Sequence, residues 1–173
     1  AALIRNDTEH VIMERAAQRL RSREFQRQEN IENITENAAK LPPPTDATNE
    51  QVNPDWTTRF FEDCQDISDP QLQTVWSGIL AGEITRPKSF HVKTLHVLRD
   101  MSKEDLVLFS TLGRLSWHIP GAGLSAIVPT DKNTVLRKLG IHLSSLSHLE
   151  HLGLITLHSL GIRVPLQREV HPQ

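Results

Sequence analysis

The chain has 173 residues, of which 38% are hydrophobic and 23% are charged. This length allows one sizeable core or two small ones, and this apolar content argues against wholesale disorder. The single cysteine, Cys64, excludes an internal disulfide framework, and no apolar run approaches the ~20 residues that a membrane span requires.

The formal net charge of −2 hides a difference between the two halves of the chain. Residues 1–84 carry eight Lys and Arg against fifteen Asp and Glu, whereas residues 85–173 carry eleven against six. A basic half points to an anionic partner, and the alternative is that the two halves neutralise each other. The charged residues 1–40 do not resemble a signal peptide, so we expect a cytoplasmic protein.

The first 41 residues predict one long helix from Leu3 to Leu41, with a break near Asn30 as an open alternative. The segment has no Gly or Pro and is rich in Arg, Glu, Gln and Ala, which favour helices. Between Leu20 and Ile31 its one apolar residue is Phe25, so the middle has little to bury by itself. We therefore expect the helix to pack on a partner or to pair with its own copy. The apolar residues at helical spacing are Val11, Ile12, Ala16, Leu20, Ile31, Ile34, Ala38 and Leu41.

A run of three prolines ends this helix, and residues 42–53 are predicted to form a polar linker. Asn53 and Pro54 then predict a capped helix start. The helix of residues 55–65 contains Cys64, which has no adjacent Lys, Arg or His and is therefore predicted to be a buried, inert thiol. The same helix presents three aromatic side chains, Trp56, Phe60 and Phe61.

A further helix is predicted to begin at a capping box of Ser68 and Gln71 and to run to Ile84. Gly78 and Gly82 within it cost about 1 kcal/mol each relative to alanine, which predicts a neighbouring helix packed very close. Its apolar residues are expected to be buried, namely Leu72, Val75, Trp76, Ile79 and Leu80.

Glu83 lies at the end of that helix, just before a basic turn that contains Arg86 and Lys88. A carboxylate there could act as a general base, but we expect it to pair with Arg86 or another basic side chain and to fix the turn. Ser89 is then predicted to cap a helix that reaches Asp100.

The last part of the chain follows the plan of a winged helix-turn-helix. A helix that starts at Ser102 would supply the first helix of its core, and an irregular segment, residues 117–129, follows. The remaining predicted elements are a helix over 131–139 ended by Gly140, a helix over 144–152 ended by Gly153, and strands over 154–158 and 162–166 that form the wing.

Three stretches of the chain also resemble an uncharacterised bacterial group. They are QENIENI (28–34), WTTRFF (56–61) and WSGILAGEI (76–84), the last followed by Ser89-Phe90 and Thr94-Leu95. The pattern is similar to domain-of-unknown-function family 2806, and also to the Abi-alpha (abortive-infection) proteins, over about residues 28–155. It departs at Lys88, where a glycine is usual. Because the family has no established activity, the resemblance implies a bacterial origin and a link to phage defence, and no functional residues.

A winged helix raises the question of DNA binding, because its second helix would offer Arg, Lys, Asn or Gln to base edges. Here the outward residues of the helix over 144–152 are Ser, His and one Glu, while basic side chains lie on its neighbours. We expect this surface to contact a protein partner, with unspecific, salt-sensitive nucleic-acid binding as the alternative. The candidate contact residues are Lys132, Arg137, Lys138, His148, His151, Arg163 and Arg168.

His148 and His151 lie three residues apart on one helix, with His142 and His158 nearby, which is a spacing that a zinc site could use. No cysteine is near them, so we interpret them as solvent-facing or capping histidines. No Gly-x-Ser-x-Gly elbow supports a Ser/His/Asp site. We therefore predict no catalytic residue, no metal and no cofactor.

Together these patterns predict a mainly α fold with four parts: a long amphipathic helix (1–41), a Pro-rich linker (42–53), a helical middle segment (54–100) and a winged-helix-like domain with a short β-hairpin wing (101–173). The predicted function is that of a non-catalytic bacterial interaction module without a membrane span. It would self-associate as a homo-oligomer and dock a protein partner, in phage defence. The alternative is a nucleic-acid-binding regulator or defence sensor that uses the winged helix.

Overall fold

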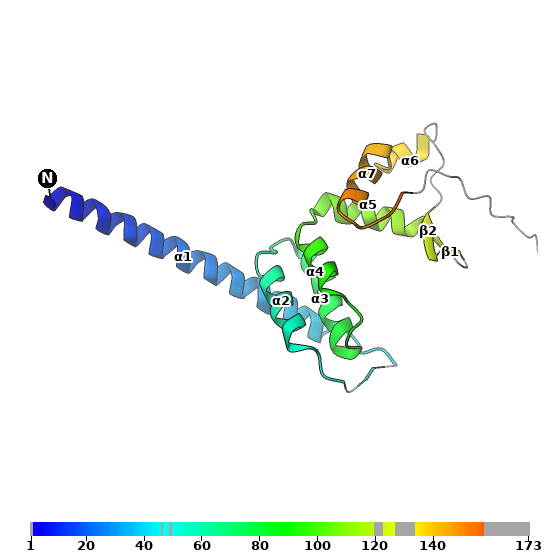
Figure 1. Ribbon diagram of the computed structural model, residues 1–173, viewed down its shortest axis with the longest axis horizontal. Coiled ribbons are helices and arrows are strands. Elements are labelled where there is room, and N and C mark those ends of the chain that lie inside the picture. The colour runs from blue at the N-terminus through cyan, green and yellow to red at the C-terminus, as the bar shows by residue number, and fades with distance from the viewer. Residues whose placement is uncertain (1, 46, 49, 120–122, 127–133, 158–173) are drawn as a thin grey trace, which may run out of the picture. The chain divides into compact units, whose positions relative to one another are not determined.

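The computed structural model describes residues 2–45, 47–48, 50–119, 123–126 and 134–157 (Figure 1). The chain is mainly helical, as predicted, and divides into two compact units, Ala1–Val107 and Leu108–Gln173. The elements are α1 (Ala2–Ala39), α2 (Pro54–Cys64), α3 (Pro70–Thr85), α4 (Val92–Arg99), α5 (Lys103–Arg114), β1 (Ser116–Ile119), β2 (Gly123–Ala126), α6 (Thr134–Lys138) and α7 (Leu143–His151).

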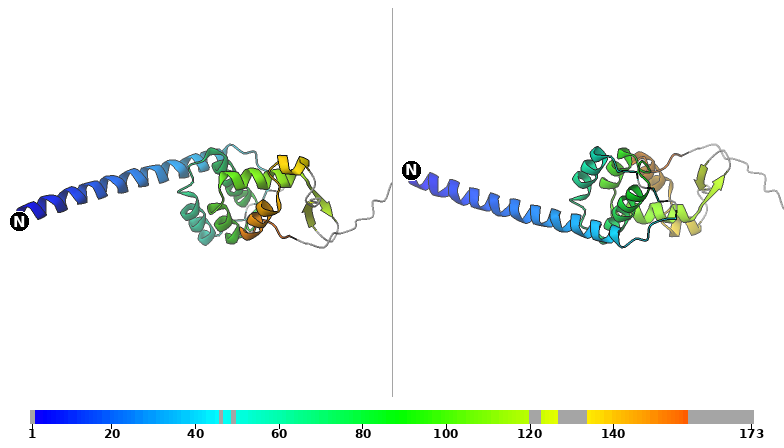
Figure 2. Two further views of the ribbon diagram at one scale, coloured as in Figure 1. Left: turned by 90° about the horizontal axis from the view of Figure 1, so that it is seen from above. Right: turned by 90° about the horizontal axis from the view of Figure 1, so that it is seen from below.

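The first helix, α1, is continuous over 38 residues, without the break near Asn30 that the sequence left open. The C-terminal part of α1 enters the core of the first unit, where Ile34 and Ala38 are buried and α1 packs on α3. The hydroxyl of Ser77 on α3 donates a hydrogen bond to the carbonyl of Ile34 at 3.0 Å. Figures 1 and 2 show the N-terminal part of α1 running out beyond α2 and α3.

Both α2 and α3 begin with a capping side chain followed by proline at the first helical position. Asn53 caps α2, as predicted, because its side chain accepts the N–H of Asp55 at 2.8 Å. The cap of α3 is Asp69, whose carboxylate accepts the amides of the residues two and three positions on. The predicted capping box of Ser68 and Gln71 is therefore wrong, because the carboxylate of Asp69 accepts the amide hydrogen bonds at the start of the helix.

The core of the first unit is built around aromatic side chains of α2 and α3. The Phe60 ring stacks on Trp56 and meets Trp76 edge to face, with ring centroids 5.2 Å apart in both pairs. Of the apolar side chains predicted to be buried on α3, Val75 is partly buried and the rest are buried. Aliphatic side chains complete this core, namely Leu72, Ile79, Leu80, Leu95, Leu98 and Met101.

Helix α2 packs on α4, and Asp63 of α2 forms polar contacts with α4. The Asp63 carboxylate is buried and accepts a hydrogen bond from the Arg99 guanidinium at 2.9 Å. The indole N–H of Trp56 also donates to the carbonyl of Phe90, just before α4, at 2.9 Å. These contacts fix α4 against α2 through polar groups that the aromatic core alone would leave unsatisfied.

The side chain of Glu83, which is 2% exposed, stabilises the turn between α3 and α4. One carboxylate oxygen accepts the backbone N–H of Lys88 at 2.6 Å, and the other accepts that of Phe90 at 2.9 Å. Glu83 therefore fixes the turn, as expected, but its hydrogen-bond partners are backbone amides and not the basic side chain that the sequence predicts.

Two expectations about this region are wrong. A Cβ on Gly82 would lie 2.8 Å from the Phe90 ring, whereas a Cβ on Gly78 would meet nothing within 4 Å, so the close neighbour is an aromatic ring of the turn and not a packed helix. Ser89 does not cap α4 either. Its hydroxyl donates to the carbonyl of Arg86 at 2.6 Å, and the N-cap residue is His91.

Lys88, in the turn between α3 and α4, has a φ of 71°. It is the one described non-glycine residue with a positive φ, a conformation in which a Cβ costs roughly 1–2 kcal/mol. Its ammonium also forms an exposed ion pair with Glu50.

We expect Lys88→Gly to be more stable than Lys88→Ala by about 1 kcal/mol, because both variants lose the ion pair and glycine alone loses the Cβ. Urea denaturation followed by tryptophan fluorescence measures the difference in the free energy of unfolding. Equal midpoints for the two variants would show that the backbone at this position is unstrained.

The second unit has a separate apolar core that joins the end of α5 to α6 and α7. Leu112, Ile141, Leu146 and Leu149 are buried in it, and the partly buried side chains packed around them are Leu108, Leu115, Leu136, Leu154, Ile155 and Leu157. Gly140 and Gly153 end α6 and α7 at the predicted positions, with φ of 78° and 77°. The ends of these two helices therefore fall where the sequence predicted them.

The strands of this unit differ from the prediction. Within the segment expected to be irregular, β1 and β2 pair antiparallel with Trp117 opposite Ser125. Residues 154–157, predicted to begin the wing, form no strand because their apolar side chains pack on the three helices. The second predicted wing strand, residues 162–166, lies outside the described residues, as does the start of the helix predicted over 131–139.

Candidate interaction surfaces

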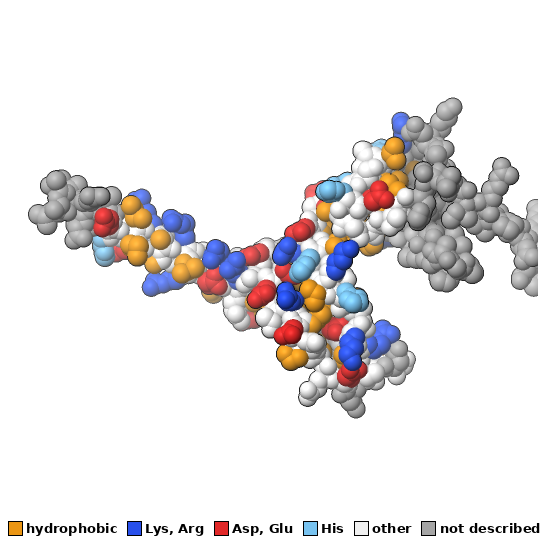
Figure 3. Space-filling model, viewed as in Figure 1, with side chains coloured by type: hydrophobic (Ala, Val, Ile, Leu, Met, Phe, Trp, Pro, Cys, Tyr) orange, Lys and Arg blue, Asp and Glu red, His pale blue; other side chains and the backbone are white. Residues whose placement is uncertain are grey.

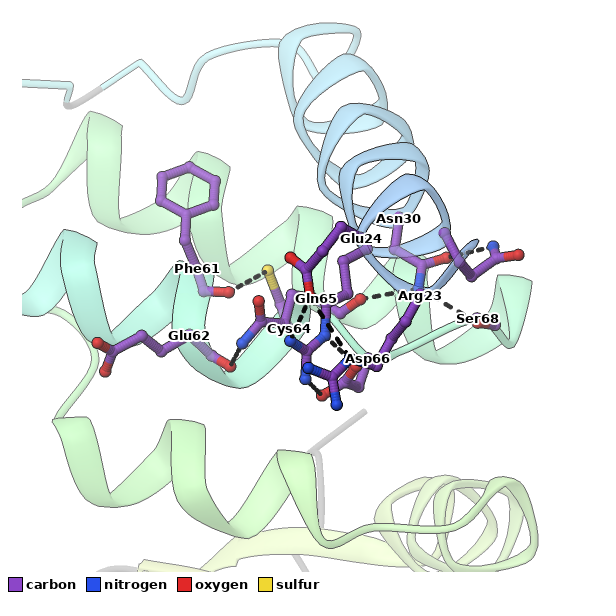
Figure 4. Close-up of polar contacts among 11 residues, drawn as sticks. Arg23, Glu24, Asn30, Phe61, Glu62, Cys64, Gln65, Asp66 and Ser68 are labelled. Atoms are coloured by element: carbon purple, nitrogen blue, oxygen red, sulfur yellow. Dashed lines mark hydrogen bonds and ion pairs between the residues drawn. The ribbon is translucent and has the colours of Figure 1, made fainter. Parts of the chain in front are cut away.

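A buried polar cluster fixes α1 to the corner between α2 and α3 (Figure 4). The centre of this cluster is Asn30, which is 2% exposed. Its amide nitrogen donates to the carbonyl of Gln65 at 2.9 Å and to the hydroxyl of Ser68 at 3.2 Å. Its amide oxygen accepts a hydrogen bond from the side chain of Gln73 at 3.2 Å. Every strong hydrogen-bonding position of this side chain is used within the first unit.

A two-point ion pair lies beside this cluster, at the surface. The guanidinium of Arg27 donates to both carboxylate oxygens of Asp66, at 2.7 and 2.9 Å, and to Glu24 at 3.0 Å. The hydrogen bond from Arg27 lowers the pKa of Asp66, and the same contact raises the pKa of Arg27. Among the described residues, Arg27 makes the most N-terminal hydrogen bond from α1 to the connection between α2 and α3.

N-terminal to Arg27, α1 exposes large apolar side chains. Ile12 is 56% exposed, Leu20 is 54% exposed and Met13 is 70% exposed, while Val11 and Phe25 are also exposed. Figure 3 shows hydrophobic side chains interspersed with basic ones along the projecting part of the helix. A solitary helix in water gains little from such side chains, so this part of α1 presents a surface that a partner can cover.

The uncovered face continues the face that is buried farther along the helix. Ile12, Ala16 and Leu20 each lie 18 residues, about five full turns, before a buried residue of α1. Those buried residues are Asn30, Ile34 and Ala38. We call the N-terminal part of this face, defined by Ile12, Ala16 and Leu20, the α1 stripe. Its side chains are apolar, as on a buried face, but the rest of the first unit does not cover them.

A basic segment borders the α1 stripe. Four arginines lie within residues 15–23, and no Asp or Glu lies between them. Arg23 donates a 3.4 Å hydrogen bond to its neighbour Glu24, and its charge adds to the effect of Arg27 in lowering the pKa of Asp66. The four arginines are evident in the sequence. The structure adds that this segment lies outside the core and that the arginines are exposed.

The residues predicted to contact a partner are divided between described and undescribed parts of the second unit. Arg137 and Lys138 are exposed in the last turn of α6, and His148 and His151 are exposed on α7. Lys132, Arg163 and Arg168 lie outside the described residues. Helix α7 contains no Lys or Arg, so the described Lys and Arg among the predicted contact residues both lie on α6.

The alternatives of a zinc site near His148 and a catalytic carboxylate at Glu83 depend on how these side chains are placed. Among the described residues, no group of three or more His, Cys, Asp or Glu is placed to hold a metal ion. The carboxylate of Glu150 accepts the N–H of Leu157 at 2.7 Å, and both oxygens of Glu83 accept backbone amides. These two carboxylates therefore have local structural roles.

The cysteine lies on the buried side of α2. Cys64 is fully buried, and burial raises the pKa of its thiol to about 12. At neutral pH the thiolate, which is the reactive form, is therefore strongly suppressed. The prediction that Cys64 is buried is confirmed. A cysteine introduced at the surface would therefore react in preference to Cys64.

Sequence reasoning missed Asn30, Arg27 and Asp66, although a signal existed for the first of them. Asn30 lies four residues before Ile34 and eight before Ala38, so it falls on the buried face of a continuous helix. A polar residue on such a face predicts a buried hydrogen-bonding partner. Nothing in the spacing could show that Arg27 pairs with a residue 39 positions away.

Within the described residues, no helix is both long enough and apolar enough to cross a membrane. No curated protein and no solved structure matches the chain. The profile of one family, described as protein of unknown function (DUF2806), matches residues 14–169, which include α2 to α7 and all of α1 except its first turns. The chain therefore belongs to the DUF2806 family.

Proposed function

We propose that this protein is a non-catalytic interaction module that self-associates through the projecting part of α1. The observation that carries the proposal is the α1 stripe, where Ile12 and Leu20 are more than half exposed although they share a face with the buried Ile34 and Ala38. Burial of a Leu or Ile side chain contributes roughly 1.5–3 kcal/mol, so pairing of two such stripes has a clear driving force.

Light scattering coupled to size exclusion tests this proposal. The 173-residue chain is expected to elute as a dimer or larger assembly, and a chain that lacks residues 1–22 is expected to be a monomer. The truncation keeps Arg27, Asn30 and the buried end of α1, so the first unit retains its core. A full chain that is monomeric at high micromolar concentration would disprove self-association.

A matched pair of point variants separates the α1 stripe from general surface hydrophobicity. Leu20→Ser, on the stripe, is expected to weaken the assembly. Phe25→Ser is the control, because Phe25 is 73% exposed and lies nine residues, about two and a half turns, after Ala16. Phe25 is therefore on the opposite side of the helix, and its replacement should leave the assembly unchanged.

We further propose that the second unit is winged-helix-like and docks a protein partner through α6 and α7. The helix-turn-helix of α5, α6 and α7 supports this proposal, as does the absence of Lys and Arg from α7. A chain with Arg137→Ala and Lys138→Ala should lose a co-purifying partner that the unmodified chain retains. Retention of that partner would place the docking surface elsewhere.

Nucleic-acid binding is the alternative proposal, and the exposed Arg137 and Lys138 at the end of α6 favour it. A protein that neutralises phosphates loses affinity steeply as salt rises, because counterions are released on binding. A salt titration with a labelled nonspecific duplex distinguishes the two proposals. Binding with a steep slope that falls in the Arg137→Ala, Lys138→Ala chain supports the alternative, and no binding at low salt excludes it.

The setting we propose is the bacterial cytoplasm, in phage defence. The support for it is the resemblance of the QENIENI, WTTRFF and WSGILAGEI segments to the Abi-alpha proteins, together with the single, buried cysteine. Plaque counts on a host with and without the gene test the defence role, and cell fractionation tests the location. Equal plaque counts across a phage panel would contradict the defence role.

A further inference from the structure

We propose that two copies of the chain pair in antiparallel orientation through residues 9–23 of α1, with Ala16 at the centre of the contact. This inference rests on the proposed self-association and adds the direction and register of the pairing. It is carried by five residues on one face of the projecting helix and by their order along it.

The five residues are spaced three, four, four and three positions apart, so they lie along one face of the helix. They are Glu9, Ile12, Ala16, Leu20 and Arg23. The intervals are the same from either end, with the small Ala16 in the middle and a large aliphatic side chain on each side. An acid stands at one end and a base at the other.

This order distinguishes the two possible orientations of a helix pair. In the antiparallel pair centred on Ala16, Glu9 of one copy faces Arg23 of the other, and Ile12 faces Leu20. In the parallel pair, Glu9 faces Glu9 and Arg23 faces Arg23. Opposite charges at the flanks of an apolar seam select the partner and its direction, and like charges disfavour it.

The side chains needed for this contact are accessible in the single chain. Ile12 and Leu20 are more than half exposed, Glu9 is exposed, and the side chain of Arg23 is 59% exposed. The central Ala16 is small enough to let two helices approach closely. The seam ends after Arg23, because the next residue on this face, Arg27, is held by Asp66 at 2.7 Å.

Cysteine cross-linking measures the direction. Chains with Glu9→Cys and chains with Arg23→Cys, distinguished by a size tag, are mixed and oxidised gently. Antiparallel pairing is expected to give predominantly the mixed cross-link between the two chains. Parallel pairing would give cross-links of each chain to its own kind. The unmodified chain is the control and should not cross-link, because its Cys64 is fully buried.

Charge reversal gives a second, independent readout. Glu9→Arg and Arg23→Glu should each raise the Kd of the dimer roughly threefold to tenfold, because each places like charges at both ends of an antiparallel seam. The double variant, with both changes in one chain, restores opposite charges and should return the Kd to its original value. In a parallel pair the same single changes replace one like-charge contact with another and leave the Kd nearly unchanged.

The outcomes separate this inference from the proposed function. A dimer by light scattering whose cross-links join like chains overturns the antiparallel pairing and leaves self-association in place. A dimer with the mixed cross-link and the charge-reversal rescue supports both. A monomer overturns both.

Discussion

Replacing Glu83 with alanine is expected to lower the free energy of unfolding of the first unit by about 3–6 kcal/mol. The carboxylate is 2% exposed and accepts two backbone hydrogen bonds, from Lys88 at 2.6 Å and from Phe90 at 2.9 Å. Each hydrogen bond to a charged acceptor contributes roughly 1.5–3 kcal/mol, and the alanine variant leaves both amides of the turn without this acceptor. Such a loss is a large fraction of the stability of an ordinary domain.

Urea denaturation followed by tryptophan fluorescence is a direct measurement of this effect. Trp56 donates to the carbonyl of Phe90, so loosening of the turn should also alter the emission of the native state. Glu62→Ala is the control, because Glu62 is exposed on α2 and its replacement should change the free energy of unfolding by no more than about 0.5 kcal/mol. Glu83→Gln retains an acceptor oxygen and should fall between the two. A loss in Glu83→Ala no larger than that in Glu62→Ala would contradict the structural role.

The role of Glu83 illustrates which part of the structure was predictable from the sequence. Its position between an apolar helix and a basic turn indicated that it fixes the turn. The pattern could not show that backbone amides are the partners, because backbone amides have no sequence signature.

The helices and their ends were largely predictable because they depend on local chemistry. Asn53 with Pro54, and the glycines at 140 and 153, each act within one helical turn, and the structure confirms them. The cap of α3 was displaced by one residue because Ser68 and Asp69 are both capping types, and only the backbone geometry chooses between them.

The strands were harder to predict because pairing is not local. The sequence predicts an irregular segment where the β1–β2 hairpin forms, because its connection is rich in Gly and Pro, and it predicts a strand over 154–158 because that run is mostly apolar. In the structure the same apolar side chains pack on the helices α5, α6 and α7. A short apolar run satisfies either arrangement, and tertiary packing decides between them.

The candidate surface on α1 was predictable in kind but not in extent. Helical spacing showed that this helix needs a partner, but its C-terminal part finds that partner within the same chain, on α3. The division falls near Arg27 and Asn30, whose contacts are with residues 35 to 43 positions away. The sequence alone therefore could not separate the part of α1 that belongs to the core from the part that remains available.

Asn30→Ala is expected to lower the free energy of unfolding by about 2–4 kcal/mol. The change removes the donor to the carbonyl of Gln65 at 2.9 Å and the acceptor for Gln73 at 3.2 Å, and it leaves both groups buried with fewer partners. Alanine favours the helix more than asparagine by roughly 0.7 kcal/mol, so the measured loss is reduced by that amount. Asn30→Asp should cost at least as much, because it places a carboxylate oxygen against the Gln65 carbonyl.

Asn33→Ala is the matched control, because Asn33 is exposed on the same helix and has the same difference in helix propensity. It should be neutral or slightly stabilising, so the difference between the two alanine variants isolates the polar cluster from the helix itself. The two variants should also leave the oligomeric state unchanged, since neither residue lies on the α1 stripe. Equal free energies of unfolding for the two would mean that packing of Ile34 and Ala38, and not hydrogen bonding at Asn30, holds α1 on the first unit.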